Sequence, residues 1–406
     1  MSAKTIIGIF LSLISLSSCQ NSSPEPAQLL PIDGNQRTVI EANNDFAIHL
    51  LNTVGKDEKK NFIISPYSCS MALGMTVNGA KDDTKEEILS VLGLEGLTQE
   101  EANQSYAKTI NTLQEADPAV KLLQANSVWY RNSFQVATPF KQAAENFFGA
   151  SVEGLDFTKS EESKQFINDW VEEKTEGKIN NLIREIQDKH VMFLINALYF
   201  KANWSTQFKK EDTYTADFLV ESIGQKPVDM MRSADYPIAH TENETIHFIQ
   251  IPYENGQYNL QILLPKHEEK IHNLVASIDY NKLTELQNSL VEEEVDFHMP
   301  KFEITYQKEL KGPLQQMGMT KSFTPEEADF NNLFEQQRED YHLTEVFQKV
   351  YIKVDEEGTE AAAATSVGVG IESAPMPLII DRSFLFFITE KHSNTILFEG
   401  IVWDPR

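Results

Sequence analysis

Residues 355–377 restrict what this chain can fold into more than any other part of the sequence. They follow a stretch of alternating apolar residues that ends at Val354, and they precede an apolar run at residues 378–388. The segment is too long for an ordinary connection, yet it lacks the polar character of a linker. Residues 359–366 are nearly all small, so they could enter between two existing strands without colliding with packed side chains. Gly358 offers a pivot, because glycine tolerates backbone angles that other residues resist.

Composition alone leaves two plainer interpretations of this segment open. It could be a surface loop, or residues 360–365 could form a short helix, because alanine has the highest helix propensity. Gly368 and Gly370 would end such a helix early.

The rest of the chain predicts helices first and strands later. Apolar residues at helical spacing predict a helix over residues 46–54. Ser65 suits the cap, Pro66 the first turn and Gly79 the end of a second helix. Another amphipathic stretch begins at Phe166 and ends at Gly177.

Five segments are predicted to form strands. Residues 190–200 are almost continuously apolar, which is typical of a strand buried on both faces. Residues 258–264 alternate between apolar and polar, which predicts a half-buried strand, and residues 349–354 alternate in the same manner. Two more strands are predicted near the end, at residues 384–388 and 395–398. Helices followed by strands indicate the α+β class.

The charge balance excludes several classes of partner. Lys and Arg total 35 against 61 Asp and Glu, a formal net charge of −26. Binding of a phosphate backbone requires clustered basic residues, and the sequence contains no such cluster. We therefore expect no binding to nucleic acid, to heparin-like polyanions or to anionic lipid surfaces.

The first residues resemble an export signal. Lys4 supplies the positive charge and residues 6–16 the apolar stretch. The tetrapeptide Leu16-Ser17-Ser18-Cys19 resembles the bacterial lipobox, in which the Cys receives a diacylglycerol and becomes the mature N-terminus. An ordinary signal peptide with an incidental Cys is the alternative.

This interpretation divides the chain into three parts. Residues 1–18 would be the lipoprotein signal peptide, residues 19–34 a flexible tether and residues 35–406 one folded domain. Acyl chains on Cys19 would form a durable membrane anchor. We expect an exported protein held in the bacterial cell envelope, with the outer membrane favoured because Gln20 does not resemble an inner-membrane retention signal. The domain would then lie in the periplasm or at the cell surface.

No feature of the sequence indicates a metal or cofactor site. Cys69 would be the single remaining thiol, so no internal disulfide can form and stability must come from packing. The spacings of common metal, phosphate and nucleophile motifs are absent. An acidic hydrolase that uses paired carboxylates would be the enzymatic alternative, but no catalytic spacing emerges.

Motifs spread over most of the chain resemble those of the serpin family, in family order. They lie at residues 61–68, 78–81, 167–179, 196–204, 228–231, 299–302, 318–319, 355–364 and 381–388. The resemblance implies a fold of three β-sheets and eight or nine helices, with an exposed reactive-centre loop at about residues 356–377. We expect a monomer.

The resemblance also implies that the protein inhibits proteases and is not an enzyme. A target serine or cysteine protease would attack the loop, form an acyl-enzyme, and be trapped when the loop inserts into the central sheet. The implied hinge of the loop comprises Glu356, Glu357, Gly358, Thr359, Glu360, Ala361, Ala362, Ala363 and Ala364. A non-inhibitory serpin that serves as carrier, chaperone or storage protein is the main alternative.

Family spacing from the hinge places the reactive bond at Glu372–Ser373. The neighbouring bond Ile371–Glu372 stays open, because the residues before Glu372 are small and aliphatic. Proteases that accept Glu, or elastase-like ones, are the expected targets, and the envelope location suggests a host-derived or neighbour-derived protease.

Five further residues match positions that the family uses for sheet opening. Ser65, Ser68 and Asn196 match a polar cluster under the central sheet, and Gln348 stands where the family usually has a His. Gln can still donate and accept hydrogen bonds. Trp204 matches the entry point of the inserting loop.

Overall fold

The structure, a computed structural model, describes residues 29–266, 269–359 and 377–406. Cys19, most of the hinge (Glu360 to Ala364) and the bond Glu372–Ser373 therefore lie outside the described residues, as does the alternative short helix at 360–365.

The helices gather mainly in the first half of the chain. In the described residues they are α1 (Gly34–Gly55), α2 (Pro66–Val77), α3 (Asp82–Val91), α4 (Gln99–Glu115), α5 (Thr138–Phe148), α6 (Ser160–Lys174), α7 (Ile271–Ser277), α8 (Tyr280–Asn288) and α9 (Lys311–Gln316), with 3-10 turns η1 (Lys210–Asp212) and η2 (Lys321–Phe323). None of the helices within the three described ranges has the length and apolarity needed to cross a membrane.

The strands are β1 (Phe62–Ile64), β2 (Lys121–Arg131), β3 (Ser151–Leu155), β4 (Met192–Asn203), β5 (Tyr214–Val220), β6 (Gly224–Glu242), β7 (Ile246–Tyr253), β8 (Tyr258–Pro265), β9 (Val291–Pro300), β10 (Phe302–Glu309), β11 (Phe347–Val354), β12 (Gly358–Thr359), β13 (Leu378–Ile379), β14 (Phe384–Glu390) and β15 (Ile396–Val402).

These strands form the three sheets that were expected. One is six-stranded, in the order β10-β11-β12-β4-β2-β3. The remaining strands form one hydrogen-bonded set, in which the long strand β6 has an irregularity between Ser233 and Tyr236. Before that point β6 pairs with β5, and after it with β7. The set therefore divides into a small sheet around β5, β6, β9 and β13 and a larger one that runs from β6 through β8 and β14 to β1.

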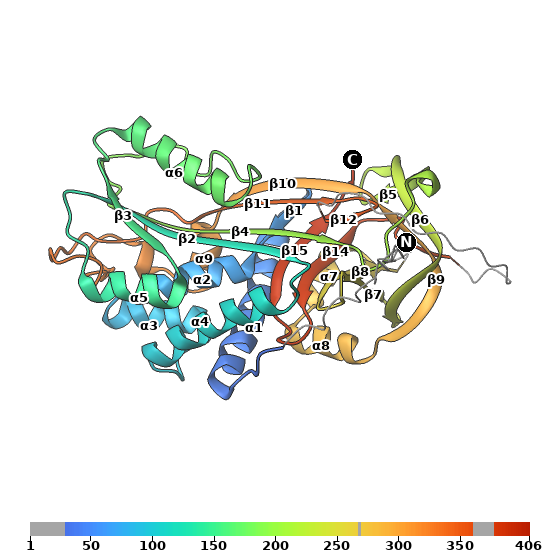
Figure 1. Cartoon of the computed structure of the whole chain (residues 1–406), viewed down its shortest axis with the longest axis horizontal. Coiled ribbons are helices and arrows are strands. Elements are labelled where there is room, and N and C mark those ends of the chain that lie inside the picture. Colours follow the sequence, from blue (N-terminus) through green and yellow to red (C-terminus); the bar gives the residue numbers. More distant parts are fainter. Residues whose placement is uncertain (1–28, 267–268, 360–376) are drawn as a thin grey trace, which may run out of the picture.

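The six-stranded sheet packs between α6 and the rest of the molecule. Figure 1 shows α6 over one face of its long strands, where Ile167 and Val171 of α6 form a cluster with Trp129 of β2 and Ile195 of β4. On the opposite face Phe200 of β4 contacts the rings of strands β7 and β8. The core thus joins the two larger sheets face to face.

Helix α2 begins and ends where the sequence predicts. The Ser65 hydroxyl accepts a hydrogen bond from the main-chain N–H of Ser68, and Pro66 occupies the first turn. Gly79 follows the end of the helix, but close packing is the reason for glycine there, because a Cβ would lie 2.1 Å from Leu333.

The prediction of a half-buried strand at residues 258–264 is wrong. Every residue of β8 is buried. The polar side chain of Gln261 is covered because it bonds to Gln250 of β7 and to Gln287 of α8. The alternation at β11, in contrast, is confirmed, with one buried and one half-buried face.

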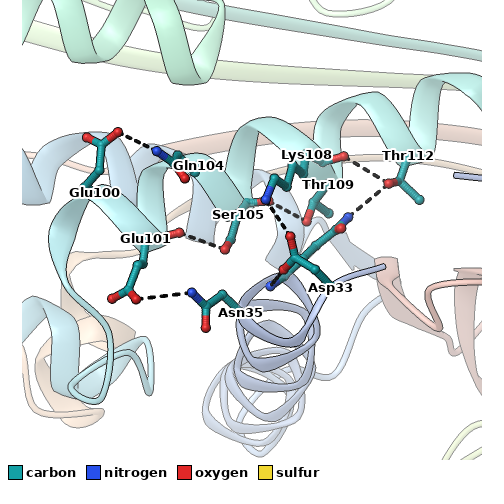
Figure 2. A network of polar contacts seen from close by, with 10 residues as sticks. Asp33, Asn35, Glu100, Glu101, Gln104, Ser105, Lys108, Thr109 and Thr112 are labelled. Atoms are coloured by element: carbon teal, nitrogen blue, oxygen red, sulfur yellow. Dashed lines mark hydrogen bonds and ion pairs between the residues drawn. The ribbon is translucent and has the colours of Figure 1, made fainter. Parts of the chain in front are cut away.

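Helix α4 is joined to the start of α1 by a polar network (Figure 2). Lys108 forms an ion pair with Asp33, the cap of α1. Gln36 donates a hydrogen bond of 3.0 Å to the Thr112 hydroxyl in the interior of this contact. The network fixes α4 relative to the first residues of the domain.

Candidate functional site at the end of strand β4

Two residues of the predicted hinge, Gly358 and Thr359, already lie in the six-stranded sheet. Gly358 and Thr359 form β12, where Gly358 pairs with Asn203 and Thr359 with Ala202 of β4. Thr359 also pairs with Val354 of β11. The chain thus begins a strand between β4 and β11.

Only glycine fits at position 358. Its φ is +152°, a region that residues with a Cβ rarely adopt. A Cβ there would lie 2.2 Å from the carbonyl oxygen of Ala202 and 2.5 Å from the Cα of Asn203. Gly358 therefore permits the hinge to approach the backbone of β4.

The side chain of Thr359 is buried and contacts Tyr253, whose ring stacks on Trp204. Its hydroxyl lies 2.8 Å from the hydroxyl of Tyr253 in β7. The Tyr253 ring stacks on Trp204, with centroids 4.5 Å apart and planes at 11°. Burial raises the pKa of Tyr253 above its ordinary value, so this hydroxyl stays neutral and can both donate and accept.

Trp204 lies where the hinge enters the sheet and holds it by the main chain. Its indole N–H donates to the carbonyl of Asp355 at 2.9 Å, and its main-chain N–H donates to the carbonyl of Glu357 at 2.9 Å. The N–H of Phe208 donates to the carbonyl of Glu356 at 2.9 Å. These three hydrogen bonds hold the hinge by its main-chain carbonyls.

The hinge residues Glu356 and Glu357 are buried and paired with lysines. Lys301 lies 3.2 Å from the carboxylate of Glu356, and Thr213 donates to it at 2.8 Å. Burial alone would raise the pKa of Glu356, but hydrogen bonds from its own backbone, Thr213 and Lys301 outweigh burial and hold that pKa below its ordinary value. Glu357 pairs with Lys210, and this hydrogen bond raises the pKa of Lys210.

A second polar group lies farther along the sheet, at the start of α2. The side chain of Gln348 in β11 bonds twice to Ser65, with its Nε2 donating to the Ser65 carbonyl at 2.7 Å and its Oε1 accepting from the Ser65 N–H at 2.8 Å. The Ser65 hydroxyl donates to the carbonyl of Leu397 at 2.7 Å. Strand β11 is thus joined to α2 and β15 without a histidine.

The group extends from Ser68 to the strands on the other side of β12. The Ser68 hydroxyl donates to the side chain of Asn196 in β4. Asn196 donates to Asn126 of β2, which donates to the Phe148 carbonyl at the end of α5. The structure therefore brings Ser65, Ser68, Asn196 and Gln348 together.

Sequence reasoning missed several members of both groups. Tyr253, Lys210 and Thr213 lie far from the hinge in the sequence, and no local pattern marks them. Lys301 belongs to a motif that the sequence analysis used without assigning the side chain a role. Asn126 lies in β2 among other polar residues, such as Gln124 and Ser127, so no local pattern marks it either.

The described ranges contain no cluster of three or more metal-ligating side chains. A cavity of about 520 Å³ lies between the N-terminal ends of β4 and β11. Its lining includes Leu73, Phe134, Met192, Leu194, Leu333 and Val346. Charged residues such as Arg131 and Glu345 also line this space, which lies on the line that a strand between β4 and β11 would follow.

The fold and the site define a protein of the serpin class. A model of the family Serpin (serine protease inhibitor) matches residues 41–405. The chain therefore belongs to the serpin family, whose members are in general protease inhibitors.

Individual relatives match over nearly their whole length. Serpin B6 of Pongo abelii is 33% identical over 376 residues, which cover 90% of this chain and 99% of that protein. Serpin B3 of Homo sapiens is 33% identical over 393 residues, 91% of this chain and 100% of that protein.

Solved structures of the family have the same fold. The thermophilic serpin tengpin in its native state matches with a TM-score of 0.84 and 29% identity, over 94% of this chain and 97% of that one. Human thyroxine-binding globulin matches with a TM-score of 0.84 and 28% identity, over 92% of this chain and 100% of that one.

Proposed function

We propose that this protein inhibits a serine or cysteine protease by acting as its suicide substrate. The observation that carries the proposal is β12, in which Gly358 and Thr359 begin a strand between β4 and β11. In the described part of the sheet, the short strand β12 lies between β4 and β11 and pairs with both. The loop after Thr359 thus starts at a position from which it could continue as a central strand.

The register of Thr359 supports this path. If its pairing with both neighbours continued, Thr365 would lie opposite Asn196 in β4 and Gln348 in β11. A hydroxyl would then arrive among the polar side chains that bridge these strands. Insertion of residues 359–372 would add a strand of about 46 Å, at roughly 3.3 Å per residue.

Capture of the protease depends on a competition between two rates. The protease nucleophile attacks the carbonyl of Glu372, the amine of Ser373 leaves, and an acyl-enzyme remains. Insertion of the loop then drags the attached protease to the far end of the sheet before water can release it. Cleavage at Glu372–Ser373 by a Glu-accepting protease is our preferred assignment, and cleavage at Ile371–Glu372 by an elastase-like protease is the alternative.

A carrier function without inhibition is the second candidate. Thyroxine-binding globulin, a fold neighbour of this chain, was solved in complex with thyroxine. The small residues of the hinge favour the inhibitor, because large or charged side chains would oppose burial in a central strand.

We also propose that Cys19 is acylated and anchors the domain to the cell envelope, with the outer membrane favoured. Helix α1, capped by Asp33, would then follow the tether directly. Labelling of the expressed protein with a fatty acid, and loss of that label in Cys19→Ser, would support the anchor. Recovery of unmodified wild-type protein without its signal peptide would contradict it.

Incubation with a panel of Glu-specific and elastase-like proteases tests the inhibitor function. An inhibitor gives a band at the summed mass that resists detergent, and mass analysis of the released fragment identifies the cleaved bond. Insertion should also raise the melting temperature of the nicked protein sharply. A nicked chain with an unchanged melting temperature and no complex would exclude the inhibitor and favour the carrier.

A further inference from the structure

Strand β4 ends at a residue that is bound to the other large sheet. The main-chain N–H and the side-chain amide of Asn203 both donate to Oε1 of Glu254, at 2.8 and 2.5 Å. The N–H of Glu254 donates in return to the carbonyl of Asn203 at 3.0 Å. Glu254 belongs to the turn between β7 and β8, so three hydrogen bonds join the two sheets where Gly358 enters.

The backbone of Glu254 is strained. Its φ is +41°, in the left-handed region that costs free energy for a residue with a Cβ. A turn usually has glycine or asparagine in this conformation, and Gly256 in the same turn has a φ of +81°. A glutamate at a strained position suggests that its carboxylate is needed there, and this carboxylate accepts two hydrogen bonds from Asn203.

The turn is also held from the opposite side. The main-chain N–H and the side-chain amide of Asn255 donate to the carboxylate of Asp117, at 3.2 and 2.9 Å. Asp117 is buried and follows α4, which the network in Figure 2 joins to α1. The turn is thus anchored by Asp117 and cannot easily move together with β4. Its contact through Glu254 therefore holds the end of β4 in place.

We propose that Glu254 is a positioning residue for loop insertion, an inference that rests on the proposed inhibitor function. It holds Ala202 and Asn203 close to Gly358, which can approach them because glycine has no Cβ. Without this contact the end of β4 can shift, and the first pairs of the new strand form more slowly. Hydrolysis of the acyl-enzyme would then overtake insertion more often.

Three variants of Glu254 test this role through the ratio of nicked chain to covalent complex. In Glu254→Ala the ratio should rise by about fivefold, because losing charge-assisted hydrogen bonds changes a rate by at least that factor. Glu254→Gln keeps the acceptor oxygen and should restore the wild-type ratio. Glu254→Gly also loses the contact, so its ratio of nicked chain to complex should match that of Glu254→Ala. Because glycine relieves the strained backbone, the intact variant should melt no lower than the wild type.

Asn203→Ala identifies the partner. It should raise the ratio like Glu254→Ala, and the double variant should be no worse than either single one. A wild-type ratio in Glu254→Ala, with normal complex formation by the wild type, would overturn only the positioning role. If the wild type neither forms a complex nor gains stability on nicking, the proposed function and this role fall together.

Discussion

The hydroxyl group of Tyr253 lies 2.8 Å from the hydroxyl group of Thr359, and both side chains are buried. Thr359, the last described residue before the loop, is therefore held by Tyr253 of β7, a strand of another sheet. Because Thr359 is 1% exposed, a longer or charged side chain at this position would be buried among its neighbours.

Thr359→Arg should convert the protein from an inhibitor into a substrate. Burial of an unpaired guanidinium costs several kcal/mol, so the loop would stay out of the sheet while the protease completes hydrolysis. The expected result on a denaturing gel is complete nicking with no covalent complex.

Thr215→Arg is the matched control for that experiment. Thr215 is an exposed residue of β5, so the same change there should leave complex formation unaltered. A stable complex with Thr359→Arg would contradict insertion at this point.

Gly358→Ala should release β12 from the sheet. The new Cβ would meet the Ala202 carbonyl at 2.2 Å, and the backbone would be held at a φ unsuited to alanine. We expect the hinge to lose about 1–3 kcal/mol of interaction with the sheet, which should be measurable as faster proteolysis near residue 358. Gly34→Ala, where a Cβ meets nothing within 4 Å, should behave as wild type, and equal proteolysis of the two variants would argue against a tight fit.

Gln348→Leu should destabilise the intact protein. It leaves the buried main-chain N–H of Ser65 without a partner and removes one of two hydrogen bonds to the Ser65 carbonyl, which keeps the N–H of Cys69, at a cost of about 1–3 kcal/mol. The melting temperature of the intact protein should fall clearly. Gln104→Leu, on the exposed surface of α4, should change it little, and an equal effect of both changes would contradict a structural role for Gln348.

Glu399→Met should raise the stability of the protein and remove part of its pH dependence. Glu399 is wholly buried in β15 and neither carboxylate oxygen has a hydrogen-bond partner, so burial raises its pKa well above the ordinary 4.5. The unfolded chain releases this proton near pH 4.5 and the folded chain keeps it. Stability therefore falls as the pH rises above 4.5, by up to about 1.4 kcal/mol per pH unit.

Melting curves at several pH values check this expectation. The difference in stability between Glu399→Met and the wild type should grow from pH 4.5 towards neutral pH. Glu244→Met, at an exposed position, is the control. A difference that does not change with pH would show that the pKa of Glu399 is not raised in the folded protein.

Local features of the fold could be predicted from the sequence. The cap of α2 depends on Ser65, Pro66 and the residues that follow, so neighbours in the chain suffice to define it. The alternation of β11 was equally informative. The burial of β8 could not be predicted, because Gln261 is covered by Gln250 and Gln287, and alternation does not reveal what packs on a polar face.

The sequence by itself determined that a segment of small residues follows a strand and that its first pivot is glycine. It also identified Ser65, Ser68, Asn196, Trp204 and Gln348 through family motifs. Only the tertiary structure decided where the segment enters, because Tyr253 and Lys301 contact the hinge, and Glu254 contacts β4, from strands and turns distant in the chain. Hydrogen bonds and ion pairs act over a few ångströms, so their partners are set by how the sheets pack and not by the order of residues.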